Sequence, residues 1–145
     1  ILACYLKKRC ILLLQGKEAG MLDARELAMA VEESWRYLEK AGLRGSVGFD
    51  LKGNLPVQAA LTLYDIFEDV GEEVLARGEA FWLCRLKETE KEWIFSVVLE
   101  EKEGETRPAS WQALSEYDVS VQCDDTGYGT RLTVRLSRES TDSFT

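Results

Sequence analysis

Residues 54–78 read NLPVQAALTLYDIFEDVGEEVLARG, and this stretch decides the class of fold. Pro56 suits the first turn of a helix, because it lacks an amide hydrogen that a helix start would leave unpaired. Apolar side chains then recur at helical spacing, at Val57, Leu61, Tyr64, Phe67, Val70 and Val74. The stretch therefore predicts a helix that begins around Asn54, ends near Gly78 and packs one side against another layer.

The segments that follow this helix predict strands. Residues 80–87 and 93–99 are rich in β-branched and aromatic residues and flank a charged turn, which is typical of a β-hairpin. Two further strands are expected around residues 119–123 and 132–136. In the last of them polar and apolar residues alternate, which predicts a sheet with one covered face and one wetter face.

The segments that precede it predict a second helix and a short strand. Asp23 and Glu26 form a capping box, and Gly42 ends the helix that we predict over residues 24–41. A short strand around Val47 follows. The order of elements predicts an α/β two-layer sandwich, in which helices cover one face of a mixed, mostly antiparallel sheet.

The first residues form an apolar segment of their own. Residues 1–15 predict a helix that is apolar on more than one side, which suits either an interface or a cap over the core. We divide the chain into this segment over residues 1–20, a domain over residues 21–137 and a tail over residues 138–145 that we expect to be disordered. Because the chain begins at Ile1 rather than Met, we expect it to be a domain of a longer polypeptide.

Composition excludes several classes of function. The net charge of −8 argues against a partner that presents a phosphate backbone, so we expect no nucleic acid. The sequence has no histidine, which removes imidazole catalysis and the common zinc sites. The four cysteines form no C-x-x-C pair and fit a reducing, cytoplasmic location. The longest purely apolar run, Ile11 to Leu14, is too short to span a membrane, and we expect no direct membrane contact.

Two carboxylates near the end of the 54–78 helix could hold a metal ion. Asp69 and Glu73 are four residues apart and project from the same side of a helix. Mg²⁺ is usually bound by one or two carboxylates together with substrate phosphates. The alternative interpretation is a solvated acidic face, to which Glu68 and Glu72 would also belong.

Two loops could approach a ligand. Glu100 opens the acidic loop that runs to Gly104, and a carboxylate at a strand end can accept from an exocyclic amine or bind a cation. Gly127, Gly129 and Thr130 enter the last strand, where glycines would let the backbone approach a ligand closely. A charged surface turn and a plain hairpin turn are the alternatives for these two loops.

The order of these three features resembles the ATP-binding domain of bacterial sensor histidine kinases. That domain has the Bergerat, or GHKL-type, fold, which it shares with gyrase and MutL. Residues 1–20 resemble the end of the kinase dimerisation helix. The resemblance spans most of the chain and implies ATP and Mg²⁺ as cofactors.

The family's motifs can be carried over position by position. In its Glu-x-x-x-Asn box, Asp69 stands at the Glu position and Glu73 at the metal-binding Asn position. Glu100 takes the place of the Asp that reads the adenine amine, and Gly104 keeps the second glycine of that box. The closing Gly129 and Thr130 match well, with the threonine beside the adenine. The resemblance therefore implies that Glu73, Glu100 and Thr130 line one pocket.

The sequence departs from the family in the remaining glycine positions. Lys102 replaces the first glycine of the adenine box, and residues 107–110 have no counterpart of the second glycine box. Glycines there let backbone N–H groups meet phosphate. The departures imply weakened nucleotide binding and hydrolysis.

The resemblance implies the ATP-binding, catalytic-type domain of a two-component sensor histidine kinase, a cytoplasmic phosphotransferase fragment without its phosphoacceptor histidine. Its partners would be the rest of the parent kinase, a response regulator and a second copy bound through the first helix. The alternative is a non-catalytic module of the same fold that serves dimerisation or signal relay. A third interpretation is an unrelated α/β binding domain that uses the wetter face of its sheet.

Overall fold

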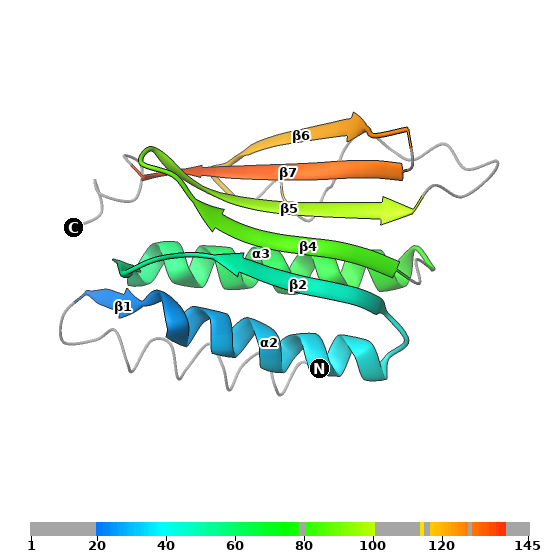
Figure 1. Ribbon diagram of the computed structural model, residues 1–145, viewed down its shortest axis with the longest axis horizontal. Coiled ribbons are helices and arrows are strands. Elements are labelled where there is room, and N and C mark those ends of the chain that lie inside the picture. The colour runs from blue at the N-terminus through cyan, green and yellow to red at the C-terminus, as the bar shows by residue number, and fades with distance from the viewer. Residues whose placement is uncertain (1–19, 79–80, 101–113, 115–116, 128, 139–145) are drawn as a thin grey trace.

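The computed structural model describes residues 20–78, 81–100, 114, 117–127 and 129–138 (Figure 1). The elements, in chain order, are β1 Met21–Asp23, α2 Ala24–Lys40, β2 Arg44–Asp50, β3 Asn54–Pro56, α3 Val57–Ala76, β4 Phe81–Glu88, β5 Glu92–Glu100, β6 Ser120–Asp125 and β7 Gly129–Ser137. Figure 1 shows α2 and α3 together on one side of the main sheet.

The main sheet has five strands in the order β2-β4-β5-β7-β6. β2 pairs with β4 in parallel, and the other three pairs are antiparallel. The parallel pair arises because α3 carries the chain from the end of one strand back to the start of the next. The predicted two-layer sandwich with a mixed, mostly antiparallel sheet and helices on one face is confirmed.

α2 begins where the capping residues predict. Asp23 is the N-cap, and its Oδ1 accepts a hydrogen bond of 2.8 Å from the backbone N–H of Arg25. The helix ends at Lys40, and Gly42 turns the chain toward β2 with a φ of 111°. Only glycine adopts such a φ readily, so Gly42 ends the helix, as predicted, by taking a backbone conformation that other residues avoid.

α3 begins at Val57, three residues later than predicted. Asn54–Pro56 is instead β3, which pairs antiparallel with β1 so that Leu55 lies opposite Leu22. Pro56 is the N-cap residue and forms no side-chain cap hydrogen bond. This two-stranded ribbon was not predicted, because three residues are too few for an alternating pattern to be read.

The core lies between the helices and the sheet, and aromatic side chains join the layers. The ring of Trp82 on β4 lies 5.6 Å from that of Phe67 on α3 and 5.8 Å from that of Trp35 on α2. Gly71 has no side chain and so lets α3 lie close to α2 and to the sheet. A Cβ placed there would lie 2.9 Å from Cδ1 of Leu38 and 3.5 Å from the Trp82 ring. The two helices and the sheet therefore meet around Gly71.

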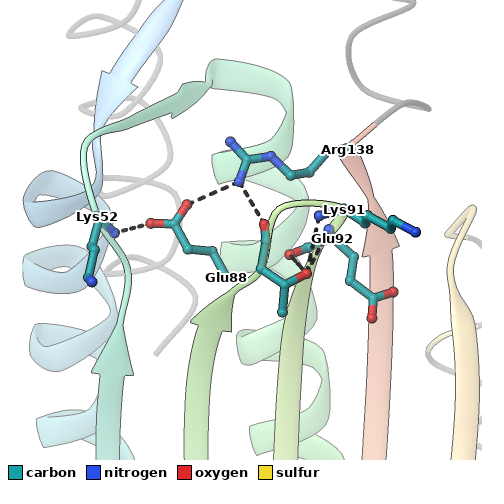
Figure 2. A network of polar contacts seen from close by, with 6 residues as sticks. Lys52, Glu88, Lys91, Glu92 and Arg138 are labelled. Carbon is teal, nitrogen blue, oxygen red and sulfur yellow. Dashed lines mark hydrogen bonds and ion pairs between the residues drawn. The ribbon is translucent and has the colours of Figure 1, made fainter.

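A polar network holds together the end of the sheet that lies away from the C-terminal end of α3 (Figures 1 and 2). The Glu88 carboxylate accepts from the backbone N–H of Lys52 and, at 3.4 Å, from Nη1 of Arg138. The same Nη1 donates to the Thr89 carbonyl at 2.8 Å, and the guanidinium lies 5.0 Å from the centre of the Trp93 ring. These contacts link the β2–β3 loop, the β4–β5 turn and the residue after β7.

Several predictions fall outside the described residues. These are the first helix over residues 1–15, the loop from residue 101 to Gly104 and the tail beyond Arg138. Within the described part of the chain, no helix is both long enough and apolar enough to cross a membrane.

Candidate functional site

The acidic side of α3 carries the two predicted metal ligands. Asp69 and Glu73 are partly buried rather than fully solvated. The hydroxyl of Tyr117 donates to Oδ2 of Asp69 at 2.5 Å, and Nη2 of Arg77 donates to Oε1 of Glu73 at 3.0 Å. Each carboxylate therefore already binds a protein group, and Tyr117 is a member of the site that no sequence pattern predicted.

One carboxylate oxygen on the acidic side of α3 lacks a hydrogen-bond partner in the described part of the chain. Oε2 of Glu73 is buried and has no hydrogen-bond partner among the described residues. A buried oxygen in this state suits a cation or an ordered water. No group of three or more acidic or cysteine side chains that could hold a metal lies together in the described residues. Mg²⁺ at Glu73 would therefore need phosphate and water oxygens as its other ligands, as is usual for this ion.

Glu68 behaves differently from its acidic neighbours on α3. It is only 4% exposed and lies with Ser34 of α2 and Tyr64, whose hydroxyl oxygens are 2.6 Å apart. Burial raises the pKa of Glu68, hydrogen bonds with Ser34 and Tyr64 oppose the rise, and the charges of Glu72 and Asp69 add to it. The predicted solvated acidic face is therefore wrong for Glu68, because α2 covers this residue.

The glycines before the last strand shape a hairpin turn. Gly127 has a φ of 82°, and its N–H donates to Oδ1 of Asp125 at 2.8 Å. The N–H of Thr126 donates to the Gly129 carbonyl at 2.9 Å, and the N–H of Gly129 donates to Oγ1 of Thr126 at 3.1 Å. A Cβ on Gly129 would lie 1.8 Å from the carbonyl oxygen of Leu99. The turn and the close pairing of β7 with β5 account for both glycines.

The register of β5 and β7 separates two residues that were expected to share a pocket. Thr130 lies opposite Leu99, and Glu100 lies opposite Gly129. Paired residues share a face and successive residues alternate between faces. Thr130 therefore faces the helices with Leu99, while Glu100 points to the other side of the sheet.

Three of the predicted site residues remain at one end of the helix-covered face. Thr130 and Leu99 continue the row of Trp82, which packs near Gly71 of α3. Figure 1 shows the C-terminal end of α3, the end of β5 and the start of β7 at the same end of the domain. The candidate site therefore consists of Asp69 and Glu73 on α3 and Thr130 on β7, with Tyr117 bonded to Asp69.

Comparison with known proteins finds a likeness in structure only. No protein-family model matches the sequence, and no curated protein matches it. Among solved structures, the histidine kinase domain of the blue-light activated histidine kinase from Erythrobacter litoralis EL346 superposes with a TM-score of 0.65 at 13% identity. That match covers 98% of this chain and 76% of the other.

Two further kinases show the same likeness. The histidine kinase AdeS of Acinetobacter baumannii gives a TM-score of 0.58 at 10% identity, over 92% of this chain and 75% of that one. The nucleotide-free catalytic domain of histidine kinase ThkA gives 0.56 at 8% identity, over 81% of this chain and 94% of that one. The chain has the fold of histidine kinase catalytic domains.

Proposed function

We propose that this chain is the ATP-binding, catalytic-type domain of a two-component sensor histidine kinase. The observation that carries the proposal is the likeness to a histidine kinase domain over 98% of the chain. The position of Asp69, Glu73 and Thr130 at one end of the helix-covered face supports it, since this arrangement suits a nucleotide bound across the end of α3.

The residues present fit a magnesium nucleotide in part. Glu73 would hold Mg²⁺ through its buried Oε2, with the phosphates completing the coordination. Thr130 would lie beside the adenine. ATP would supply the phosphoryl group, and the metal would neutralise charge on the phosphates.

The other components would come from outside this chain. It has no histidine, so the phosphoacceptor would belong to another part of the parent kinase. A response regulator would then receive the phosphoryl group, and ThkA has been crystallised with the response regulator protein TrrA. Both transfers would take place in the cytoplasm.

Calorimetric titration with Mg²⁺ and a non-hydrolysable ATP analogue tests the proposal. We expect measurable heat and a rise in melting temperature, and we expect Glu73→Gln to weaken binding at least about tenfold, or about 1.4 kcal/mol. Glu72→Gln is the matched control, because Glu72 is an exposed carboxylate next to Glu73 on α3. The absence of heat and of a thermal shift at millimolar nucleotide would contradict the proposal.

The second candidate is a non-catalytic module of the same fold that relays a signal or holds a dimer. Three observations favour it: Tyr117 is bonded to Asp69, Arg77 is bonded to Glu73, and Glu100 points away from Thr130. Tyr117→Phe separates the two candidates. If this variant binds the Mg²⁺ nucleotide more strongly than the wild type, the ATP-binding candidate is supported, with a nucleotide site that Tyr117 occludes.

If neither the wild type nor Tyr117→Phe binds nucleotide, the relay module is the better assignment. A dimer formed through the first helix would then be expected, and deletion of residues 1–15 should abolish self-association. Sedimentation velocity of the full chain and of the shortened chain measures this. A wild-type protein that stays monomeric at high concentration would exclude the dimerisation role.

A further inference from the structure

The face of the sheet that is turned away from α2 and α3 carries a groove of about 550 Å³. Its floor is one row of residues, since the strand register places Gly48, Arg85, Ser96 and Thr133 side by side across β2, β4, β5 and β7. Gly48 and Ser96 add little volume, and a Cβ placed on Gly48 would meet nothing within 4 Å. The groove therefore runs across the strands.

Larger side chains form its two rims. Leu83, Val98 and Arg131 line one side, and Lys87 and Arg135 stand on the other. Each rim is two residues from the floor along the strands, so the rims are ~13 Å apart at ~3.3 Å per residue. Four strands spaced ~4.8 Å apart give a length of ~14 Å. An α-helix with its side chains is ~10–12 Å across, and two to three of its turns cover that length.

The groove is basic although the whole chain is acidic. Arg85, Lys87 and Arg131 form no ion pair or hydrogen bond within the described residues, whereas Arg135 is paired with Glu92 at 2.5 Å. Three cationic side chains thus remain without an acidic partner in the described part of a chain whose net charge is −8. Such a surface attracts a partner of negative charge.

The carboxylates on this face, which include Glu100 at the end of β5, lie around the groove, and none of them lines it. Asp50 lies opposite Lys87 and Asp124 opposite Arg131, but neither forms an ion pair within the described residues. Oδ1 of Asp124 accepts instead from Nε2 of Gln122 at 3.2 Å. Arg85, in the floor, has no carboxylate opposite it in either neighbouring strand. The centre of the groove is therefore its most positive part.

We propose that this groove binds an acidic amphipathic helix of a partner protein. Its carboxylates would pair with Arg85, Lys87 and Arg131, and its apolar residues would contact Leu83, which is 45% exposed, and Val98. The cations are spread over the floor and both rims, which suits several carboxylates along a helix better than one small anion. The groove lies on the opposite face of the sheet from Asp69 and Glu73, so the proposal does not depend on nucleotide binding.

Fluorescence anisotropy with the full chain and a labelled synthetic helix of about 12 Glu, Leu and Ala residues tests this proposal. We expect saturable binding that weakens as salt is added, because partly exposed ion pairs are screened. Arg85→Glu should weaken binding at least about tenfold. Gly48→Leu should also weaken it, because its side chain would fill the floor from a position where a Cβ meets nothing within 4 Å.

The matched control is Arg36→Glu, an exposed position on α2 that changes the net charge by the same amount. It should leave the affinity unchanged. If Arg36→Glu weakens binding as much as Arg85→Glu, only net charge matters and the groove proposal fails. Equal binding of a peptide with Lys in place of Glu would overturn it, as would displacement by millimolar inorganic phosphate or no binding at millimolar protein. Circular dichroism checks that each variant is folded, and Arg85→Glu decides the outcome if Gly48→Leu does not fold.

Discussion

The hydroxyl of Tyr117 donates a hydrogen bond of 2.5 Å to Oδ2 of Asp69, which joins the segment before β6 to the acidic side of α3. The backbone around Tyr117 is itself held in place. Its N–H donates to the Leu114 carbonyl at 3.2 Å, and its carbonyl accepts from the N–H of Val119 at 3.0 Å. Leu114 is buried in the core. The contact therefore belongs to the packed structure and occupies Oδ2 of Asp69.

Tyr117→Phe should lower the free energy of unfolding by about 1–2 kcal/mol, because it removes a partly buried hydrogen bond to a carboxylate. Urea unfolding followed by circular dichroism measures the change. Tyr37→Phe is the control, since Tyr37 is 40% exposed on α2 and its replacement should change stability by less than about 0.5 kcal/mol. Equal stability of the two variants would show that the bond contributes nothing.

Gly129→Ala should destabilise the protein by about 3 kcal/mol or prevent folding, because the new Cβ would lie 1.8 Å from the Leu99 carbonyl oxygen. Gly48→Ala is the matched substitution on the same sheet. Its Cβ meets nothing within 4 Å, so we expect a gain of up to about 1 kcal/mol from the stiffer unfolded chain. Thermal and urea unfolding compare the two. A mild effect at Gly129 would mean that β7 is less tightly paired with β5 than the register indicates.

Glu68 should make stability depend on pH. Burial raises its pKa above the ordinary value of 4.5, so the folded state binds the proton more tightly than the unfolded chain does. The protonated Glu68 therefore contributes its full stabilisation of the folded state below pH 4.5. This contribution is lost as the pH rises from there through the raised pKa. A glutamine at position 68 cannot ionise, so Glu68→Gln should not lose this stabilisation. The free energy of unfolding of the variant, minus that of the wild type, should therefore rise with pH and then level off.

Urea unfolding at a series of pH values measures this difference between wild type and Glu68→Gln. Glu90→Gln, at an exposed position in the β4–β5 turn and not among the groups that act on Glu68, should leave the pH profile unchanged. A wild-type protein that gains stability relative to Glu68→Gln as pH rises would contradict the raised pKa of Glu68.

Cys84 and Cys123 should differ in their reactivity toward thiol reagents. Cys84 is buried, and burial raises the pKa of its thiol, whereas Cys123 is partly exposed at β6. The thiolate is the reactive form, so iodoacetamide should modify Cys123 in the native protein and Cys84 only after unfolding. Peptide mass spectrometry of native and denatured samples gives the extent at each site. Rapid native labelling of Cys84 would indicate frequent opening of the core.

Elements with a long local pattern could be predicted. The capping residue Asp23 located the start of α2, and the spacing of Leu61, Phe67 and Val74 identified the buried side of α3. The β-branched and aromatic residues on both sides of a charged turn predicted the β4–β5 hairpin. β1 and β3 were missed, because their three-residue pairing, including Leu22 with Leu55, depends on contact between segments far apart in the chain.

The candidate site was predictable only in part. Four-residue spacing is enough to place Asp69 and Glu73 on one side of a helix. The burial of Glu68 was missed because α2 supplies the cover. A signal for it exists, since Ser34 lies in line with the buried Val31 and Leu38 and marks a polar position within an apolar stripe.

The sequence by itself determined the two long helices, the strands of the main sheet and which of their sides are apolar, because helical and strand periodicity are local properties of the chain. Only the tertiary structure decided that Thr130 and Glu100 point to opposite faces and that Tyr117 reaches Asp69. The physical reason is that strand register and the packing of distant segments are set by hydrogen bonds and contacts between residues far apart in the sequence. A shift of one residue in the pairing of β5 with β7 would reverse the faces of one strand relative to the other without altering either local pattern.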